Sequence, residues 1–90
     1  MYILSFSTQF KKDYKRVLKR GYDIQKLHEA FIILEDTGTL PVSKYKTHLL
    51  KGDYKNHYEA HIEPDWLIIW FTVTNKEITL VRTGTHSDLF

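Results

Sequence analysis

The stretch WLIIWFTV, from Trp66 to Val73, is the part of the sequence that decides the fold. Apolar side chains occupy both its odd and its even positions, so a strand formed here needs cover on both faces. The unbroken apolar run from Trp66 to Phe71 is far too short to cross a bilayer. We therefore expect a central strand of a sheet, covered on both sides or packed under helices.

Other strands are expected on either side of this run, separated by turn sequences. They are Tyr2 to Phe6, a short strand near Lys46 to Leu50, Tyr54 to Ile62, and Ile78 to Arg82. KGDY, EPD (Glu63 to Asp65) and TNKE form the turns, because Gly, Asp, Asn and Pro favour tight reversals. Most of the sheet is therefore expected to be antiparallel.

Two helices are expected between the first strand and the rest of the sheet. Ser7 is a suitable N-cap for the first, whose apolar residues recur at helical spacing from Phe10, and Gly21 ends it. Asp23 caps the second helix and Gly38 ends it. The order β-α-α-β-β-β-β predicts an α+β fold, with two N-terminal helices packed on a mostly antiparallel sheet of four to five strands. Residues 1–90 are expected to form a single domain.

Composition places the chain among ordinary globular proteins, with 42% hydrophobic and 27% charged residues. The chain has no cysteine, which excludes disulfides and a thiol nucleophile and fits a reducing cytoplasm. The first ten residues lack the positively charged N-terminal region and the long apolar stretch of a signal peptide. We expect a soluble, cytoplasmic protein that has no contact with a membrane.

The net charge is only +2, but basic residues are concentrated in two places. Lys11 to Arg20 holds six basic residues against one acid. A second cluster comprises Lys44, Lys46, Lys51 and Lys55. Such runs form either a solvated surface or a surface for phosphate backbones, and charge alone leaves both open.

Hairpin connections bring chemically useful residues to one end of the sheet. If three consecutive strands run up, down and up, the first ends at His61 and the second starts at Asp65 and Trp66. The third delivers Arg82 and the residues beyond it to the same end. Gly84 can bend the chain so that His86 folds over the edge.

The residues gathered at this end of the sheet suit the cleavage of RNA by its own 2′-OH. The reaction needs a base for the hydroxyl proton, an acid for the leaving 5′-oxygen, and a cation beside the phosphate. His86 is the candidate acid and Arg82 the phosphate-stabilising cation, while Asp65 and His61 remain alternatives for the base. Trp66 or Phe90 could stack an unpaired base. The scheme requires no metal or other cofactor.

Each residue also has a structural alternative. His61 could be a strand histidine bonded to a carbonyl, Asp65 could cap the EPD turn, and Arg82 could pair with an acid. Trp66 could belong to the core. A zinc site is disfavoured because the spacing from His61 to Asp65 is no known ligand pattern and Arg82 would repel the ion.

The segments HIEPDWLIIW and RTGTHSDLF, with HLLKGDY upstream, resemble the YafQ branch of the RelE-like bacterial toxins. The resemblance implies the toxin of a type II toxin–antitoxin pair, an endoribonuclease that cuts mRNA at the ribosome. By this resemblance the catalytic residues would be His48, His61, Asp65, Arg82 and His86. Trp66 and Phe90 would line the site. Lys51 and Lys55 are expected to bind substrate, and Lys11 to Arg20 to contact rRNA.

The implied partners are mRNA on the ribosome and a small antitoxin, whose complex with the toxin represses its own operon by binding operator DNA. His48 is included on the resemblance alone, because a tight KGDY hairpin would place it opposite His57, about 13 Å from His61 at ~3.3 Å per residue. Two rivals are a gyrase-directed toxin without catalysis and a plain RNA-binding module.

Overall fold

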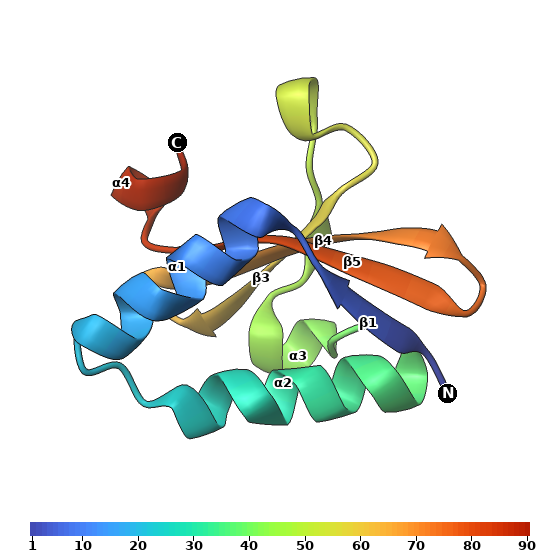
Figure 1. The fold of residues 1–90 in the computed structure, drawn as a ribbon. Helices are drawn as coiled ribbons and strands as arrows, with labels where there is room; N and C mark the ends of the chain where they lie inside the picture. Colours follow the sequence, from blue (N-terminus) through green and yellow to red (C-terminus); the bar gives the residue numbers. More distant parts are fainter.

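One five-stranded sheet joins segments from both ends of the chain (Figure 1). The computed structural model describes residues 1–90. The strands are β1 (Ile3–Phe6), β2 (His48–Leu49), β3 (Tyr58–Glu63), β4 (Trp66–Thr74) and β5 (Glu77–Gly84), in the spatial order β1-β5-β4-β3-β2. All neighbouring pairs are antiparallel except β1 and β5. The α+β fold with a mostly antiparallel sheet is confirmed.

Two long helices follow β1, with the caps that the sequence predicts. They are α1 (Thr8–Lys19) and α2 (Ile24–Thr37), and the shorter helical segments are α3 (Val42–Tyr45), η1 (Gly52–Tyr54) and α4 (His86–Leu89). The Ser7 hydroxyl accepts from the Phe10 amide at 2.9 Å, and the Asp23 carboxylate accepts from the Gln25 amide at 3.2 Å. These bonds satisfy amides that the first turn of a helix leaves without partners.

The central strand β4 is buried on both faces, as predicted. Trp66, Ile68 and Trp70 face the main core, which α1, α2 and α3 cover. Leu67 and Ile69 face the other side and pack with Leu89 of α4, beneath partly buried residues of the segment around η1. Because both faces lose water, the helices and the C-terminal turn are held to the same strand.

The region before β3 differs from the prediction. We expected a tight hairpin at KGDY and a strand from Tyr54; instead η1 occupies residues 52–54 and β3 begins at Tyr58. Asn56 adopts a left-handed conformation (φ 68°), which interrupts any extended strand there. The partner strand β2 is only two residues long. The longer segment between β2 and β3 changes the residue that pairs with His48, which affects the position of His48 in the candidate site.

Strand β1 lies parallel to β5, with Ile3 opposite Glu77 and Phe6 opposite Leu80. The first strand is thus an edge strand that borders the last one, although the two are far apart in sequence. None of the helices has the length and apolar character that a membrane span needs.

Candidate active site

The C-terminal turn α4 places His86 over the end of the sheet. Its N-cap Thr85 forms a capping box with Asp88, in which the two side chains accept from each other's backbone amides at 3.1 and 2.9 Å. Gly84 just before it has a φ of 153°, and a Cβ there would lie 2.8 Å from the Asp88 carboxylate. Glycine therefore allows the sharp bend that the sequence predicts.

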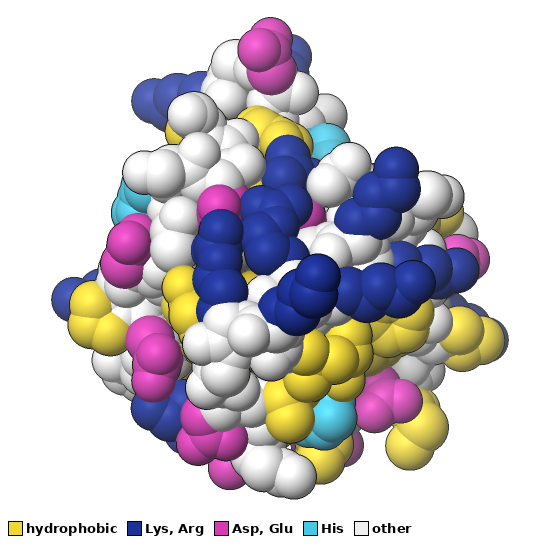
Figure 2. All heavy atoms as spheres, turned by 60° about the vertical axis from the view of Figure 1, so that its left-hand side comes forward, with side chains coloured by type: hydrophobic (Ala, Val, Ile, Leu, Met, Phe, Trp, Pro, Cys, Tyr) yellow, Lys and Arg dark blue, Asp and Glu magenta, His cyan; other side chains and the backbone are white.

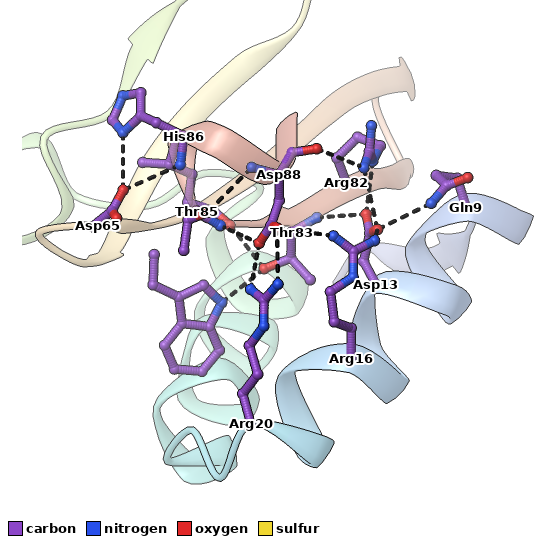
Figure 3. A network of polar contacts seen from close by, with 12 residues as sticks. Gln9, Asp13, Arg16, Arg20, Asp65, Arg82, Thr83, Thr85, His86 and Asp88 are labelled. Atoms are coloured by element: carbon purple, nitrogen blue, oxygen red, sulfur yellow. Dashed lines mark hydrogen bonds and ion pairs between the residues drawn. The ribbon is translucent and has the colours of Figure 1, made fainter. Parts of the chain in front are cut away.

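His86 and Asp65 form a hydrogen-bonded pair at this edge. One carboxylate oxygen of Asp65 accepts from the His86 amide at 3.1 Å and contacts the His86 Nδ1 at 3.2 Å (Figure 3). A carboxylate can only accept, so Nδ1 carries the proton and Nε2 is left for other partners. These two bonds lower the pKa of Asp65, which keeps it ionised.

His61 lies beside this pair and is oriented by the turn that follows it. Its Nδ1 lies 3.2 Å from the Pro64 carbonyl oxygen, which can only accept, so the neutral ring has a free lone pair on Nε2. The rings of His61 and His86 are 6.2 Å apart, and the Phe90 ring is also 6.2 Å from His86. The structure thus brings together His61, Asp65, His86 and the 62% exposed Phe90.

His48 belongs to the same surface, and the register expected for it is wrong. His48 pairs with Glu59 rather than His57, because the chain leaves the sheet from Leu50 to His57 instead of forming a tight turn. The His48 Nε2 lies 3.2 Å from a Glu59 carboxylate oxygen, and the His61 Nε2 lies 3.9 Å from the same oxygen. One carboxylate therefore links the two imidazoles.

Glu59 is a site residue that the sequence reasoning missed. It is only 4% exposed, and the imidazoles of His48 and His61 are its only ion-pair partners. Its position two residues before His61, on the same face of β3, was a usable signal. A carboxylate amid a run of strand residues is easily taken for a solvent-facing side chain.

Arg82 approaches the site from β5 and is held by a buried acid of α1. Its Nε donates to Asp13 at 2.7 Å and its Nη2 to the same carboxylate at 3.3 Å, while Nη2 lies 3.4 Å from the Asp88 carbonyl oxygen. The Asp13 carboxylate raises the pKa of Arg82, which stays a cation. The acid pairing considered for Arg82 is therefore present, and 18% of its side chain remains exposed.

Asp13 is the second residue that the sequence reasoning missed. It is fully buried and also accepts from Gln9, Arg16 and the Thr83 amide, at 3.1, 2.7 and 3.1 Å (Figure 3). It is the one acid in the basic stretch from Lys11 to Arg20, for which the sequence left open a solvated surface and a surface for phosphate backbones. The spacing of Asp13 from buried Phe10 and Val17, at i+3 and i−4, was the available signal.

The arginines of α1 also hold α4 in place. Arg20 donates to Asp88 with both terminal nitrogens, at 2.6 and 3.0 Å, and Arg16 lies 3.2 Å from the same carboxylate. The Arg20 guanidinium keeps the pKa of Asp88 far below its ordinary value. Arg16 thus bridges Asp13 and Asp88, so α1 supports both Arg82 and the turn that carries His86.

Trp66 lies in the core, which was the structural alternative for it. The side chain is 1% exposed, and its Nε1 donates to the Thr83 hydroxyl at 2.9 Å. The hydroxyl in turn donates to the Leu67 carbonyl at 2.7 Å. In this conformation Trp66 offers no face to a base, and it ties β4 to β5 directly behind the site.

Basic side chains gather on one face of the molecule. Figure 2 shows Lys and Arg in a band across that face, and α1 with its C-cap contributes six basic residues, namely Lys11, Lys12, Lys15, Arg16, Lys19 and Arg20. Lys51 and Lys55 flank η1 and are exposed. A hollow of about 480 Å³ between α1 and α2 is lined by Phe6, Phe10, Lys11, Tyr14, Lys15 and Phe31. It contains none of the predicted catalytic residues.

Chemically, the structure offers two imidazoles held through their Nδ1 atoms, two carboxylates and a fixed guanidinium. No group of three or more His, Cys, Asp or Glu side chains is arranged to hold a metal ion. An acid and a base on opposite sides of a phosphate, beside a cation, suit phosphoryl transfer to a neighbouring hydroxyl.

Comparisons with known proteins show which family this chain resembles. Residues 2–90 match the family model for the bacterial toxin of type II toxin–antitoxin system, YafQ. The mRNA interferase toxin YafQ of Escherichia coli K12 is 41% identical over 88 residues, covering 97% of this chain and 94% of that protein. The structure of the E. coli DinJ–YafQ complex matches with a TM-score of 0.86 at 40% identity, covering 100% of this chain and 99% of that one. A metal-bound toxin from Helicobacter pylori matches with a TM-score of 0.87 at 36% identity, over the full length of both chains.

Proposed function

This chain belongs to the YafQ family of bacterial type II toxins, and we propose that it is an endoribonuclease that cuts mRNA on the ribosome. The observation that carries the proposal is the cluster of His61, Asp65 and His86 beside Arg82, with each imidazole oriented through Nδ1. The name of the E. coli relative, an mRNA interferase, supports the same activity.

In the proposed reaction the substrate supplies its own nucleophile. His61 Nε2 accepts the proton of the ribose 2′-OH, and the 2′-oxygen bonds to the adjacent phosphorus. The bond from phosphorus to the 5′-oxygen breaks, and His86, in its doubly protonated imidazolium form, gives the Nε2 proton to that oxygen and keeps the Nδ1 proton, which is hydrogen-bonded to Asp65. The products are a 2′,3′-cyclic phosphate and a 5′-hydroxyl, and no metal takes part.

The geometry favours His61 over Asp65 as the base. Asp65 is committed to the amide and the ring of His86, and its lowered pKa makes it a poor proton acceptor near neutral pH. Its role in this proposal is to orient His86. Glu59 orients His48 and His61 from the opposite side.

Arg82 is assigned to the charge that builds on the phosphate oxygens, with Asp13 holding the guanidinium plane. Phe90, Lys51 and Lys55 are assigned to the substrate, because they are exposed around the same edge. Trp66 is assigned a structural role, because its hydrogen bond to Thr83 holds β4 to β5. The basic face of α1 is assigned to rRNA.

The proposed protein partner is a small antitoxin, by analogy with the E. coli complex of DinJ and YafQ. We place operator DNA binding in the complex of toxin and antitoxin rather than in this chain alone. An open reading frame for a small antitoxin beside the toxin gene would support the assignment.

The test is cleavage of a defined mRNA on programmed ribosomes by the purified protein. Primer extension should locate cuts inside the coding sequence. The new 3′ ends should resist phosphatase until a 2′,3′-cyclic phosphodiesterase opens the ring, which identifies the cyclic phosphate. Recovery of intact mRNA would overturn the proposal in favour of a binding module. Trapped gyrase–DNA complexes with intact mRNA would indicate a gyrase-directed toxin instead.

A further inference from the structure

A second hollow, which we name the lysine hollow, opens beside His61. Its volume is about 250 Å³, and it is lined by Lys44, Lys46, His61, Ile62, Glu63 and Pro64. We propose that the lysine hollow binds a backbone phosphate of the RNA strand next to the scissile one. This inference rests on the proposed ribonuclease function and extends it to a specific substrate contact.

The charge in the hollow favours an anion. Glu63 is the only carboxylate in the lining, and Lys26 forms an ion pair with it from outside the hollow. This pairing raises the pKa of Lys26. Lys44 and Lys46 take part in none of the ion pairs of the chain. Two ammonium groups are therefore available for a phosphate that enters beside the imidazole.

The backbone that carries the lysines is fixed before any ligand arrives. Tyr45 is 3% exposed and anchors α3 in the main core, and the Lys44 ammonium lies 5.3 Å from the centre of its ring. Lys46 caps α3 in a left-handed conformation (φ 52°), with its amide donating to Val42 at 2.8 Å. A non-glycine residue in that conformation costs energy and is often found at functional sites.

The same segment touches the candidate catalytic residues. The Lys46 carbonyl lies 3.1 Å from the Nδ1 of His48, and His61 forms one wall of the hollow. The ring of His86 lies 6.2 Å from that of His61, and Asp65 contacts the His86 ring at 3.2 Å. A strand of RNA with its scissile phosphate between His61 and His86 would therefore present a neighbouring phosphate to the hollow. Only single-stranded RNA, with its flexible backbone, follows such a path.

The proposal is tested by measuring the binding of a fluorescent 2′-O-methyl RNA oligonucleotide, which cannot be cleaved, over a series of NaCl concentrations. Each lost phosphate contact lowers the slope of log K against log [salt] by about 0.7 for single strands. Both lysines are assigned to one phosphate, so the double variant Lys44→Ala/Lys46→Ala should lose about 0.7 from the slope. It should also bind roughly two- to fivefold more weakly per lysine at 0.1 M salt.

Three further variants make the test specific. Lys76→Ala removes one exposed charge at the β4–β5 turn, at the other end of the sheet, and should leave the slope unchanged. Glu63→Gln removes the only carboxylate of the lining and should tighten binding. Lys26→Ala exposes that carboxylate and should weaken binding, although Lys26 does not line the hollow.

An unchanged slope in the double variant, or an equal loss in Lys76→Ala, would overturn the lysine hollow as a phosphate site. The phosphate site and the ribonuclease function can be disproved separately. If the unaltered protein binds the oligonucleotide with the expected lysine dependence but cuts no mRNA, the site stands and the proposed function falls. If it cuts mRNA and the lysines leave the slope unchanged, only the site falls.

Discussion

Arg82 and Asp13 are 69 positions apart in the sequence and meet through two hydrogen bonds of 2.7 and 3.3 Å. Asp13 is fully buried, whereas part of the Arg82 side chain reaches the surface. The buried carboxylate fixes the plane of the guanidinium, which also lies 3.4 Å from the Asp88 carbonyl oxygen of α4, the helix that carries His86. A residue of the first helix thus sets the position of the proposed phosphate-binding cation.

Replacing Asp13 with Asn should destabilise the fold and slow cleavage together. The variant leaves Arg82 and Arg16 without their shared anion, and removing one partner of a buried pair costs roughly 3–5 kcal/mol. Urea denaturation measures the free energy of unfolding, and single-turnover cleavage measures the chemical step. Asp36→Asn on α2 is the control, and a loss below about 1 kcal/mol in Asp13→Asn would contradict the assigned role.

Replacing His86 with Ala should abolish cleavage and leave the fold intact. A general acid contributes about 10²–10⁴-fold to the rate, and the His86 side chain is 58% exposed, so little packing is lost. Cleavage of ribosome-bound mRNA and the melting temperature are the two measurements. His28→Ala on α2 serves as the control, because that ring pairs with Tyr14 away from the site. A folded His86→Ala variant that still cuts mRNA would refute the assignment.

Acid should destabilise the protein through Asp88. The folded-state pKa of Asp88 lies below its unfolded value of 3.8, so its carboxylate stabilises the fold above that pH. This contribution is lost progressively as the pH falls below about 4. Chemical denaturation at pH 7, 4 and 3 should show a smaller acid loss in Asp88→Asn than in the unaltered protein. An equal loss in both would show that Arg20 and Arg16 do not stabilise α4 through this carboxylate.

Replacing Gly84 with Ala should cost more than the same change at Gly21. Both positions have positive φ angles, but a Cβ at Gly84 meets the Asp88 carboxylate at 2.8 Å, whereas a Cβ at Gly21 meets nothing within 4 Å. Strain alone costs about 1–3 kcal/mol at such positions. Gly84→Ala should in addition reduce cleavage, because α4 must shift with His86. Denaturation and cleavage assays of the two variants, compared side by side, test this difference.

Cleavage should survive the removal of transition metals. The proposed acid, base and cation are all side chains, although the H. pylori relative was solved in a metal-bound form. A chelator selective for transition metals, used with free Mg²⁺ retained to keep ribosomes intact, should leave the cleavage rate unchanged. Loss of activity that zinc or copper restores would show that the reaction needs a metal.

The sequence predicted the parts of the fold that local rules govern. Ser7, Asp23 and the apolar stretch from Trp66 placed two helices and the central strand, because caps and periodicity act over a few residues. The predicted hairpins also brought His61, Asp65 and His86 to one edge. These positions depend only on which end of a strand each residue occupies.

What the sequence could not reveal depends on contacts between distant segments. The left-handed residue Asn56 lengthens the loop before β3, and this moves His48 from His57 to Glu59. In the sequence, Asp13 is only one acid in a basic helix. Its role becomes visible in the structure, where α1 packs on β5 and the Thr83 amide donates to the Asp13 carboxylate. Tertiary packing determines the register of His48 and the burial of Asp13. Residue propensities and residue spacing do not predict tertiary packing.

The parallel pairing of β1 with β5 also sets an order of events during synthesis. Ser5 and Thr79, whose hydroxyls meet at 2.9 Å, are 74 residues apart, so the first strand has no partner until nearly the whole chain has been made. Arg82 and His86 emerge later still. A nascent chain therefore cannot assemble the cluster of His61, Asp65 and His86 until β5 and α4 have been translated.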